Sequence, residues 1–193
     1  MTAEGQSQEG KDRHPSLDER FDPGYLVVAY DPSWPRAAKD EIARVKDALG
    51  GVALSVEHVG STSVPGLAAK PIIDLQVTVA SLGDGESFTG PLEALGYSYI
   101  NDPASPEYLF FARPLARPRS HHLFVCEAGG HEERRHLAVR DFLRAHPDDA
   151  RAYEELKREV SSRTPRDRLA YIAGKDEFVQ DLQRRALAWR QSR

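Results

Sequence analysis

The residues best suited to chemistry lie in one short stretch, where an apolar run ends in Gly60-Ser61 and an acid follows at Asp74. Glycine lets the backbone turn without a steric penalty, and the amides after it then open a helix. Unpaired amides at a helix start, with the hydroxyls of Ser61 and Ser63, suit a phosphate group. A tight turn with an ordinary serine cap is the simpler alternative, and the turn by itself is compatible with both.

The acid lies in residues 71–79, an apolar and β-branched run that predicts a strand. Side chains alternate along a strand, so Asp74 and Gln76 share one face and the apolar residues between them share the other. A carboxylate in this position suits Mg²⁺ or Mn²⁺, because these cations prefer oxygen ligands and substrate phosphates. An ion pair between Asp74 and Lys70 is the simpler alternative.

Spacing excludes two familiar motifs. Five residues separate Gly60 from Gly66, whereas a Walker A loop has four and then Gly-Lys-Ser/Thr. His131 and His136 are five positions apart and diverge by about 140° around a helix, whereas a zinc-protease helix places its histidines four apart. A solvated charged helix is therefore predicted at this point.

A second polar group, His121 and His122, opens residues 121–126, which are predicted as the last strand. The apolar residues of that strand belong to the core, so His122 is expected on the side of Asp74. There His122 could complete a catalytic and metal-binding site with Asp74 and Glu57. A hydrogen-bonded structural histidine pair is one alternative, and a transition-metal hydrolase built on both histidines is another.

Three cationic side chains, Lys70, Arg113 and Lys175, are candidates for neutralising a bound phosphate. Lys70 lies four residues before Asp74. Arg113 begins a proline-broken loop that leads into the histidine strand, and Lys175 ends residues 171–175 on the last helix. A solvated surface would carry such charges as well.

The other segments supply the elements that must position these residues. Strands are predicted over residues 25–30, 52–59, 71–79, 97–100, 108–112 and 121–126, with the fourth and fifth joined as a hairpin. A helix is predicted over residues 33–49, and residues 81–90 are predicted as a loop before a short helix. Three helices follow residue 131, the last capped by residues 164–167 and continuing through residue 182. The predicted fold class is α+β (α/β): a mixed sheet of five or six strands with helices packed on it and a helical C-terminal third.

Composition describes an ordinary globular protein of 193 residues, with 40% hydrophobic and 29% charged residues. Residues 1–22 hold few large apolar side chains and are predicted to be a flexible tail, and residues 23–193 a single domain. The net charge of −4 does not favour a nucleic-acid partner. One cysteine and the lack of a run of about 18 apolar residues predict a cytoplasmic protein without a membrane partner. The oligomeric state is not indicated.

The spacing of Gly60-Ser61 and Asp74 resembles the signature of the nucleotidyltransferase superfamily, in which twelve residues separate a Gly-Ser turn from an acid. In that pattern the turn grips nucleotide phosphates, and two acids on the next strand hold two metal ions. Gln76 stands where the second acid is expected and brings no negative charge.

A longer set of segments resembles the GrpB family over residues 25–182. These segments are YDPSWP at 30–35, EHVGSTSVPGLAAKPIID at 57–74, HHL at 121–123 and RDFLRAHPDDARAYEELK at 140–157. The resemblance implies the nucleotidyltransferase fold, and members are often named for an association with dephospho-CoA kinase. Phe124 departs from the usual His-His-Leu-His of the family.

The resemblance implies a metal-dependent nucleotidyltransferase or phosphoryl transferase acting on a nucleoside triphosphate or another phosphorylated small molecule. The alternative, favoured by Gln76 and Phe124, is a catalytically inactive module that binds a nucleotide, a small ligand or a partner protein. The kinase reaction itself is not expected of these residues, because they contain no Walker A loop.

Overall fold

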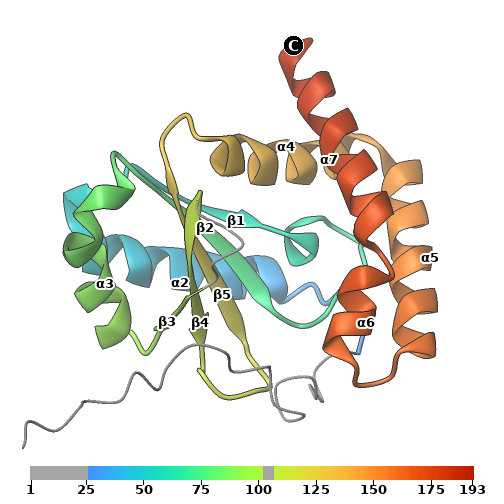
Figure 1. Ribbon diagram of the computed structural model, residues 1–193, viewed down its shortest axis with the longest axis horizontal. Coiled ribbons are helices and arrows are strands. Elements are labelled where there is room, and N and C mark those ends of the chain that lie inside the picture. Colours follow the sequence, from blue (N-terminus) through green and yellow to red (C-terminus); the bar gives the residue numbers. More distant parts are fainter. Residues whose placement is uncertain (1–25, 102–106) are drawn as a thin grey trace, which may run out of the picture.

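The computed structural model describes residues 26–101 and 107–193, which build a five-stranded mixed sheet with helices on both faces (Figure 1). The strands are β1 (Ser55–Val59), β2 (Ile73–Val79), β3 (Ser98–Ile100), β4 (Tyr108–Arg113) and β5 (His121–Glu127). Their order in the sheet is β1-β2-β5-β4-β3, with β2 and β5 parallel and each other neighbouring pair antiparallel. The predicted mixed sheet is confirmed.

One face of the sheet is covered by α2 (Trp34–Leu49) and α3 (Gly85–Ala94), which also pack against each other. The apolar side chains of β2 are buried in this core: Ile73, Leu75, Val77 and Val79. Asp74 and Gln76 alternate with them and point to the opposite face, as the sequence predicts.

The opposite face is crossed by α4 (His131–Ala145), and α5 (Pro147–Arg163), α6 (Arg168–Ala173) and α7 (Asp176–Gln191) form a helical layer beside it (Figure 1). A second apolar core joins α4 and α7 to the connection that follows β1. Its buried members are Val64, Leu67, Ala138, Phe142, Leu143, Leu182 and Ala186. The predicted helical C-terminal third is therefore confirmed. Among the residues described, no helix is long and apolar enough to cross a lipid bilayer.

Two predicted segments near the sheet are wrong. Residues 26–30 form no regular strand, because their neighbour Ala69 lies in an irregular connection and offers a single bridge to Val28. Residues 81–90 are not a loop: a 3₁₀ turn, Leu82–Asp84, leads directly into α3. Phe88 and Leu92, one helical turn apart, are fully buried, and this packing outweighs the low helix propensity of the local glycines.

Smaller differences concern element ends. The predicted strand 52–59 begins only at Ser55, because Gly50–Val52 form a 3₁₀ turn. β3 and β4 pair antiparallel as the predicted hairpin requires, whereas residues 102–106 of its turn lie outside the described residues. The predicted tail over residues 1–22 also lies outside them.

The predicted third C-terminal helix is two helices, α6 and α7, which are separated at Gly174-Lys175. A Cβ on Gly174 would lie 2.6 Å from Val160 Cγ1, so glycine lets this break pack closely against α5. Leu169 and Ile172 of α6 are more than a third exposed. The break also places Lys175 at the start of α7.

Candidate functional site

The sheet register brings Gly60, Asp74 and His122 to the same end of the sheet. Val59, the last residue of β1, pairs with Asp74 in antiparallel β2, so Gly60 follows directly beside the acid. Asp74 in turn pairs with His122 in parallel β5, and Asp74 Oδ1 lies 3.0 Å from His122 Nδ1. Both side chains are largely buried, so the carboxylate and the imidazole hold each other in place.

The Gly60 turn is tight and mostly satisfied by its own hydrogen bonds. Gly60 adopts φ 69° and ψ −174°, a conformation that essentially only glycine tolerates, and Ser61–Ser63 form a single 3₁₀ turn rather than the start of a long helix. The Ser63 hydroxyl donates to Gly60 O at 2.6 Å, so Ser63 belongs to the turn. Ser61 instead faces a cleft, where its hydroxyl is hydrogen-bonded to Tyr153.

The cleft at this end of the sheet has a volume of about 200 Å³. The predicted residues that line it are Gly60, Ser61, Lys70, Asp74, His122 and Lys175. Residues that the sequence analysis did not place there also line it, namely Thr62, Ala69, Ile72, Tyr153, Lys157 and Tyr171. The structure thus brings together six of the predicted site residues. It adds to them a lysine and two tyrosines from α5 and α6.

Lys157 is the most consequential of the residues that sequence reasoning missed. It lies one helical turn after Tyr153 on the apolar stripe of α5, and its side chain is almost wholly buried. Its ammonium group donates a hydrogen bond to Ala68 O and lies 4.6 Å from the Tyr153 ring centroid. The sequence did contain a signal for Lys157, because its spacing places it on the buried stripe of the helix. A lysine is rarely buried without a specific reason.

Burial sets the protonation of the cleft. It is the main reason that the pKa of Lys157 is lowered to about 7 and that of Lys175 to about 8, and the charge of the neighbouring Lys70 contributes to the value for Lys175. Burial also raises the pKa of Tyr153 to about 12, so the phenol stays protonated. Near neutral pH a bound anion would therefore favour the protonated form of both amines.

Glu57, predicted as a metal ligand, is not in the cleft. Glu57 Oε2 lies 2.8 Å from Arg140 Nη1, which also donates to His58 O, so the guanidinium of α4 already neutralises this carboxylate. Gln76 is fully buried beneath α4, where its Oε1 lies 3.0 Å from His136 Nδ1. Within the described ranges, Asp74 is thus the one carboxylate that lines the cleft.

The donor set decides which metal arrangement fits. One carboxylate, with substrate phosphates completing the coordination, fits a single Mg²⁺ or Mn²⁺. It does not fit the two-ion arrangement, which needs a second acid where Gln76 and Glu57 are otherwise engaged. Within residues 26–101 and 107–193, Gln76 Nε2 and His122 Nε2 are buried without a hydrogen-bond partner.

Arg113 and His121 lie on the far side of the sheet from the cleft. Arg113 Nη1 forms a 3.0 Å ion pair with Glu41, a buried acid of α2 that also accepts a 3.0 Å hydrogen bond from the Tyr97 hydroxyl. Arg113 Nη2 lies 3.2 Å from His121 Nδ1. His121 and His122 point to opposite faces, as neighbours on a strand do, so they cannot share one metal ion. The structure therefore places Arg113 away from the cleft, where it was predicted to bind phosphate.

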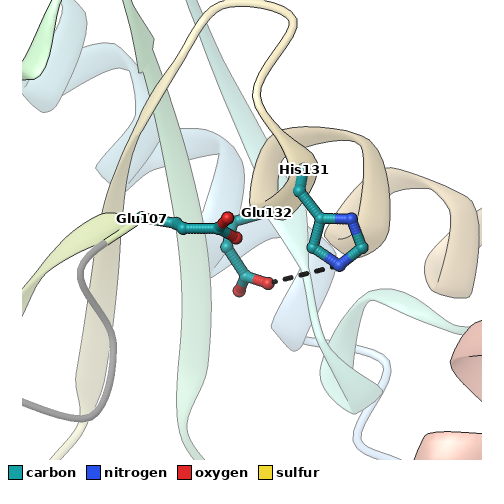
Figure 2. Close-up of side chains that lie close together, drawn as sticks. All are labelled: Glu107, His131 and Glu132. Atoms are coloured by element: carbon teal, nitrogen blue, oxygen red, sulfur yellow. Dashed lines mark ion pairs between the residues drawn. The ribbon is translucent and has the colours of Figure 1, made fainter.

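The charged start of α4 differs from the solvated helix predicted for it. His136 is buried against β2 and Phe124, and burial lowers its pKa to about 4. Figure 2 shows a separate cluster of Glu107, His131 and Glu132, whose ligand atoms lie within 4.8 Å of one another. Arg135 bonds both oxygens of Glu132, so a cation would have to displace a guanidinium to bind there.

Larger hollows exist elsewhere on the surface. One of about 430 Å³ lies between residues 64–67 and the start of α5, and one of about 690 Å³ lies beside the 3₁₀ turn Leu82–Asp84. Neither contains a histidine, and neither brings a carboxylate together with a group of lysines. The smaller cleft at Asp74 is therefore the better candidate for chemistry.

Comparison with known proteins places the chain in a family. The profile of the family described as GrpB protein matches residues 25–185. A UPF0157 protein of Pseudomonas aeruginosa is 42% identical over 165 residues, covering 84% of this chain and 67% of that protein. A dephospho-CoA kinase of Mycolicibacterium paratuberculosis is 35% identical, covering 86% of this chain but 47% of the kinase.

A solved structure agrees with this placement. The crystal structure of conserved protein GrpB from Enterococcus faecalis superposes with a TM-score of 0.79 at 33% identity. The match covers 86% of this chain and 99% of that one, so the two chains share a fold over most of their length. The family match spans nearly all the described residues, and the chain belongs to the GrpB family.

Proposed function

We propose that this protein is a nucleotidyltransferase or phosphoryl transferase that acts on a nucleoside triphosphate or another phosphorylated small molecule. One observation carries the proposal. A glycine-serine turn, a carboxylate–imidazole pair and three lysines converge in a single cleft at one end of the sheet. Such transfers need little covalent chemistry from the protein and depend on positioning and charge neutralisation, which these groups can supply.

Each group has a distinct part in this proposal. The lysines and the Ser61 hydroxyl hold the phosphate oxygens, and Asp74 holds one Mg²⁺ or Mn²⁺ together with those oxygens. His122 contacts Asp74 and fixes the direction of its carboxylate. The fixed orientation of these groups favours the transition state, because no reorganisation is needed as charge develops.

Two further observations support a nucleotide substrate. The spacing from Gly60-Ser61 to Asp74 resembles the nucleotidyltransferase signature, and the structure brings these residues side by side. A relative that contains a segment similar to this chain is named a dephospho-CoA kinase, which associates the family with phosphoryl chemistry. The kinase reaction is not part of the proposal, because these residues contain no Walker A loop.

Titration calorimetry with nucleoside triphosphates in the presence of Mn²⁺, together with an assay for released pyrophosphate or phosphate, tests the proposal. The expected result is saturable binding and product release by the wild-type chain. Asp74→Asn should abolish release, whereas Asp47→Asn on the exposed face of α2 should leave it unchanged. If no nucleoside triphosphate binds with either Mg²⁺ or Mn²⁺, the proposal fails.

A second candidate function is nucleotide binding without turnover. Gln76 occupies the position of the second acid and is committed to His136, and Glu57 is neutralised by Arg140. Both observations remove charge that a two-ion transferase would use. A rise in melting temperature with nucleotide, without any product after prolonged incubation, would favour this binding module over the transferase.

A further inference from the structure

The side of the cleft that faces Asp74 is built by the C-terminal helices and carries a cluster of three lysines. Lys157 comes from α5, Lys175 from the break before α7, and Lys70 from the connection that precedes β2. We call Lys70, Lys157 and Lys175 the lysine cluster. It joins residues more than a hundred positions apart in the chain, so the fold assembles it.

Aromatic rings hold the lysine cluster in place. Lys70 Nζ and Lys175 Nζ lie 5.6 and 5.4 Å from the centroid of the same Tyr171 ring, which is itself buried. Lys157 lies against Tyr153 and donates to Ala68 O. An ammonium group over an aromatic ring is attracted to the electron-rich face of the ring, which restricts where the ammonium group lies. These contacts restrain the lysine cluster, which therefore differs from mobile surface lysines.

Positive charges outnumber negative ones among the groups that act on Lys157: Lys70, Lys175 and Arg158 against Glu154. Among the residues that the structure describes, one carboxylate, that of Asp74, lines the cleft with the three ammonium groups. Glu154 favours the charged form of Lys157, but the oxygens of Glu154 also accept hydrogen bonds from Ala68 N and Arg158 Nε. Lys70, Lys175 and Arg158 all disfavour the charged form of Lys157. Lys70 and Arg168 disfavour the charged form of Lys175, whereas Asp176 and Asp74 favour it. An anion of high charge would relieve the mutual repulsion of the lysines when it binds.

We propose that the lysine cluster is a clamp for two or more adjacent phosphate groups, which it binds without a divalent ion and in place of a second metal. The inference rests on the proposed function, because it concerns the phosphates that the same cleft would take. It goes further by naming the side chains that select adjacent phosphate groups over a single one, and by making this binding independent of a metal ion. A single phosphate or a sulfate meets only part of the lysine cluster and binds more weakly.

Calorimetry in the presence of EDTA tests the clamp, with inorganic pyrophosphate, orthophosphate and sulfate as the probes and the full chain as the receptor. Pyrophosphate is expected to bind at least about tenfold more tightly than orthophosphate or sulfate, because each charged hydrogen bond contributes about a tenfold factor or more. Lys157→Met and Lys175→Met should each weaken pyrophosphate binding by about tenfold or more on the same basis. Lys46→Met, an exposed lysine of α2, is the matched control and should have no effect.

The outcomes separate the clamp from the proposed function. Methionine approximates the lysine stem, and melting curves of both variants confirm that the chain is folded before binding is compared. Pyrophosphate binding that needs a divalent ion, or that survives both cluster substitutions, overturns the clamp even if nucleotides are turned over. Metal-free pyrophosphate binding that is lost in both variants supports the clamp, even where no nucleotide is ever turned over and the transferase proposal fails.

Discussion

Gly60 and Asp74 are in such close contact that a side chain on one excludes the other. A Cβ built on Gly60 would lie 2.9 Å from both Cβ and Cγ of Asp74 and closer still to its carboxylate. The antiparallel pairing of β1 with β2 imposes this approach, because it sets the residue after Val59 beside the acid. The turn and the carboxylate are therefore one structural unit, and a substitution in either should alter the geometry of both.

Gly60→Ala should disable the site as well as strain the backbone. Gly66→Ala is the matched control, because Gly66 also has a positive φ, of 80°, but its added Cβ would meet open space. Overpacking costs about 1–3 kcal/mol, so Gly60→Ala should lower the free energy of unfolding by about that much more than Gly66→Ala. Chemical denaturation measures the difference, and calorimetry should show nucleotide binding lost in Gly60→Ala alone. Equal behaviour of the two variants would contradict the close approach.

Asp74→Asn should act in opposite directions on two ligands. Loss of the carboxylate removes the proposed metal ligand, so the affinity for a nucleotide with Mn²⁺ should fall. The same loss removes the negative charge that faces the lysine cluster, so metal-free pyrophosphate should bind about three- to tenfold more tightly. Asp84→Asn, at an exposed position beside α3, serves as the control. Parallel losses for both ligands would show that Asp74 maintains the structure of the cleft and does not set its charge.

Lys157 should make stability depend on pH. Its pKa falls from the ordinary 10.5 to about 7 on folding because burial disfavours the ammonium form, with Glu154 opposing and Lys175, Arg158 and Lys70 adding to the shift. Between these values the unfolded chain binds a proton that the folded chain has released. The free energy of unfolding therefore rises with pH from about 7 to 10, by up to about 1.4 kcal/mol per pH unit for this single group.

Urea unfolding of wild-type and Lys157→Met chains at pH 6.5, 8 and 9.5 measures this contribution. Other titrating groups affect both chains alike and cancel in the difference between them. The stability of the wild type relative to Lys157→Met should increase as the pH rises. Superimposable pH profiles for the two chains would show that Lys157 is not buried as the structure has it.

Arg113→Met should destabilise the protein without changing ligand affinity. The substitution leaves Glu41 buried without its 3.0 Å ion pair, although Arg44 and the Tyr97 hydroxyl still contact this acid. Breaking a buried pair costs about 3–5 kcal/mol, and the remaining partners should reduce the loss to about 2–3 kcal/mol. Chemical denaturation gives this value, and pyrophosphate calorimetry should match the wild type. A selective loss of pyrophosphate affinity in a fully stable variant would return Arg113 to the site.

Gln76→Glu should fail to create a second metal position. The new carboxylate would lie against His136, which contacts Gln76 at 3.0 Å, and would raise the pKa of that imidazole from about 4. A glutamate–histidine pair beneath α4 would then form in place of a metal ligand. Titration with Mn²⁺ in the presence of nucleotide should still give one ion per chain, as in the neutral control Gln76→Met. Two ions per chain and faster turnover would show that this acid alone was missing.

Local sequence determined much of the sheet and the first half of the cleft. Alternation along residues 71–79 assigned the apolar side chains of β2 to one face and Asp74 to the other, because the strand repeat is a property of the backbone. The same repeat placed His122 on the side of Asp74. The Gly60 turn was also recognisable, since its conformation needs glycine wherever the rest of the chain lies.

Tertiary structure alone decided the second half of the cleft. Lys157 and Tyr153 reach it from α5, whose periodicity shows a buried stripe but not what that stripe faces. The break at Gly174 positions Lys175, and it depends on the close contact of Gly174 with Val160, a residue of another helix. Glycines near residue 85 predicted a loop, whereas burial of Phe88 made a helix.

The local sequence pattern likewise did not predict which partner would neutralise each charged side chain. Arg113 and Glu57 looked like site residues because they lie near the histidines and the turn along the chain. Because α2 packs on the sheet, Arg113 forms an ion pair with Glu41 of that helix. Because α4 packs on the opposite face, its Arg140 forms an ion pair with Glu57. Sequence determines which side chains can carry charge and on which face of an element they lie. Burying and pairing these charges has a free energy that depends on every neighbouring element. That free energy decides where each charge is neutralised and which charges remain for a ligand.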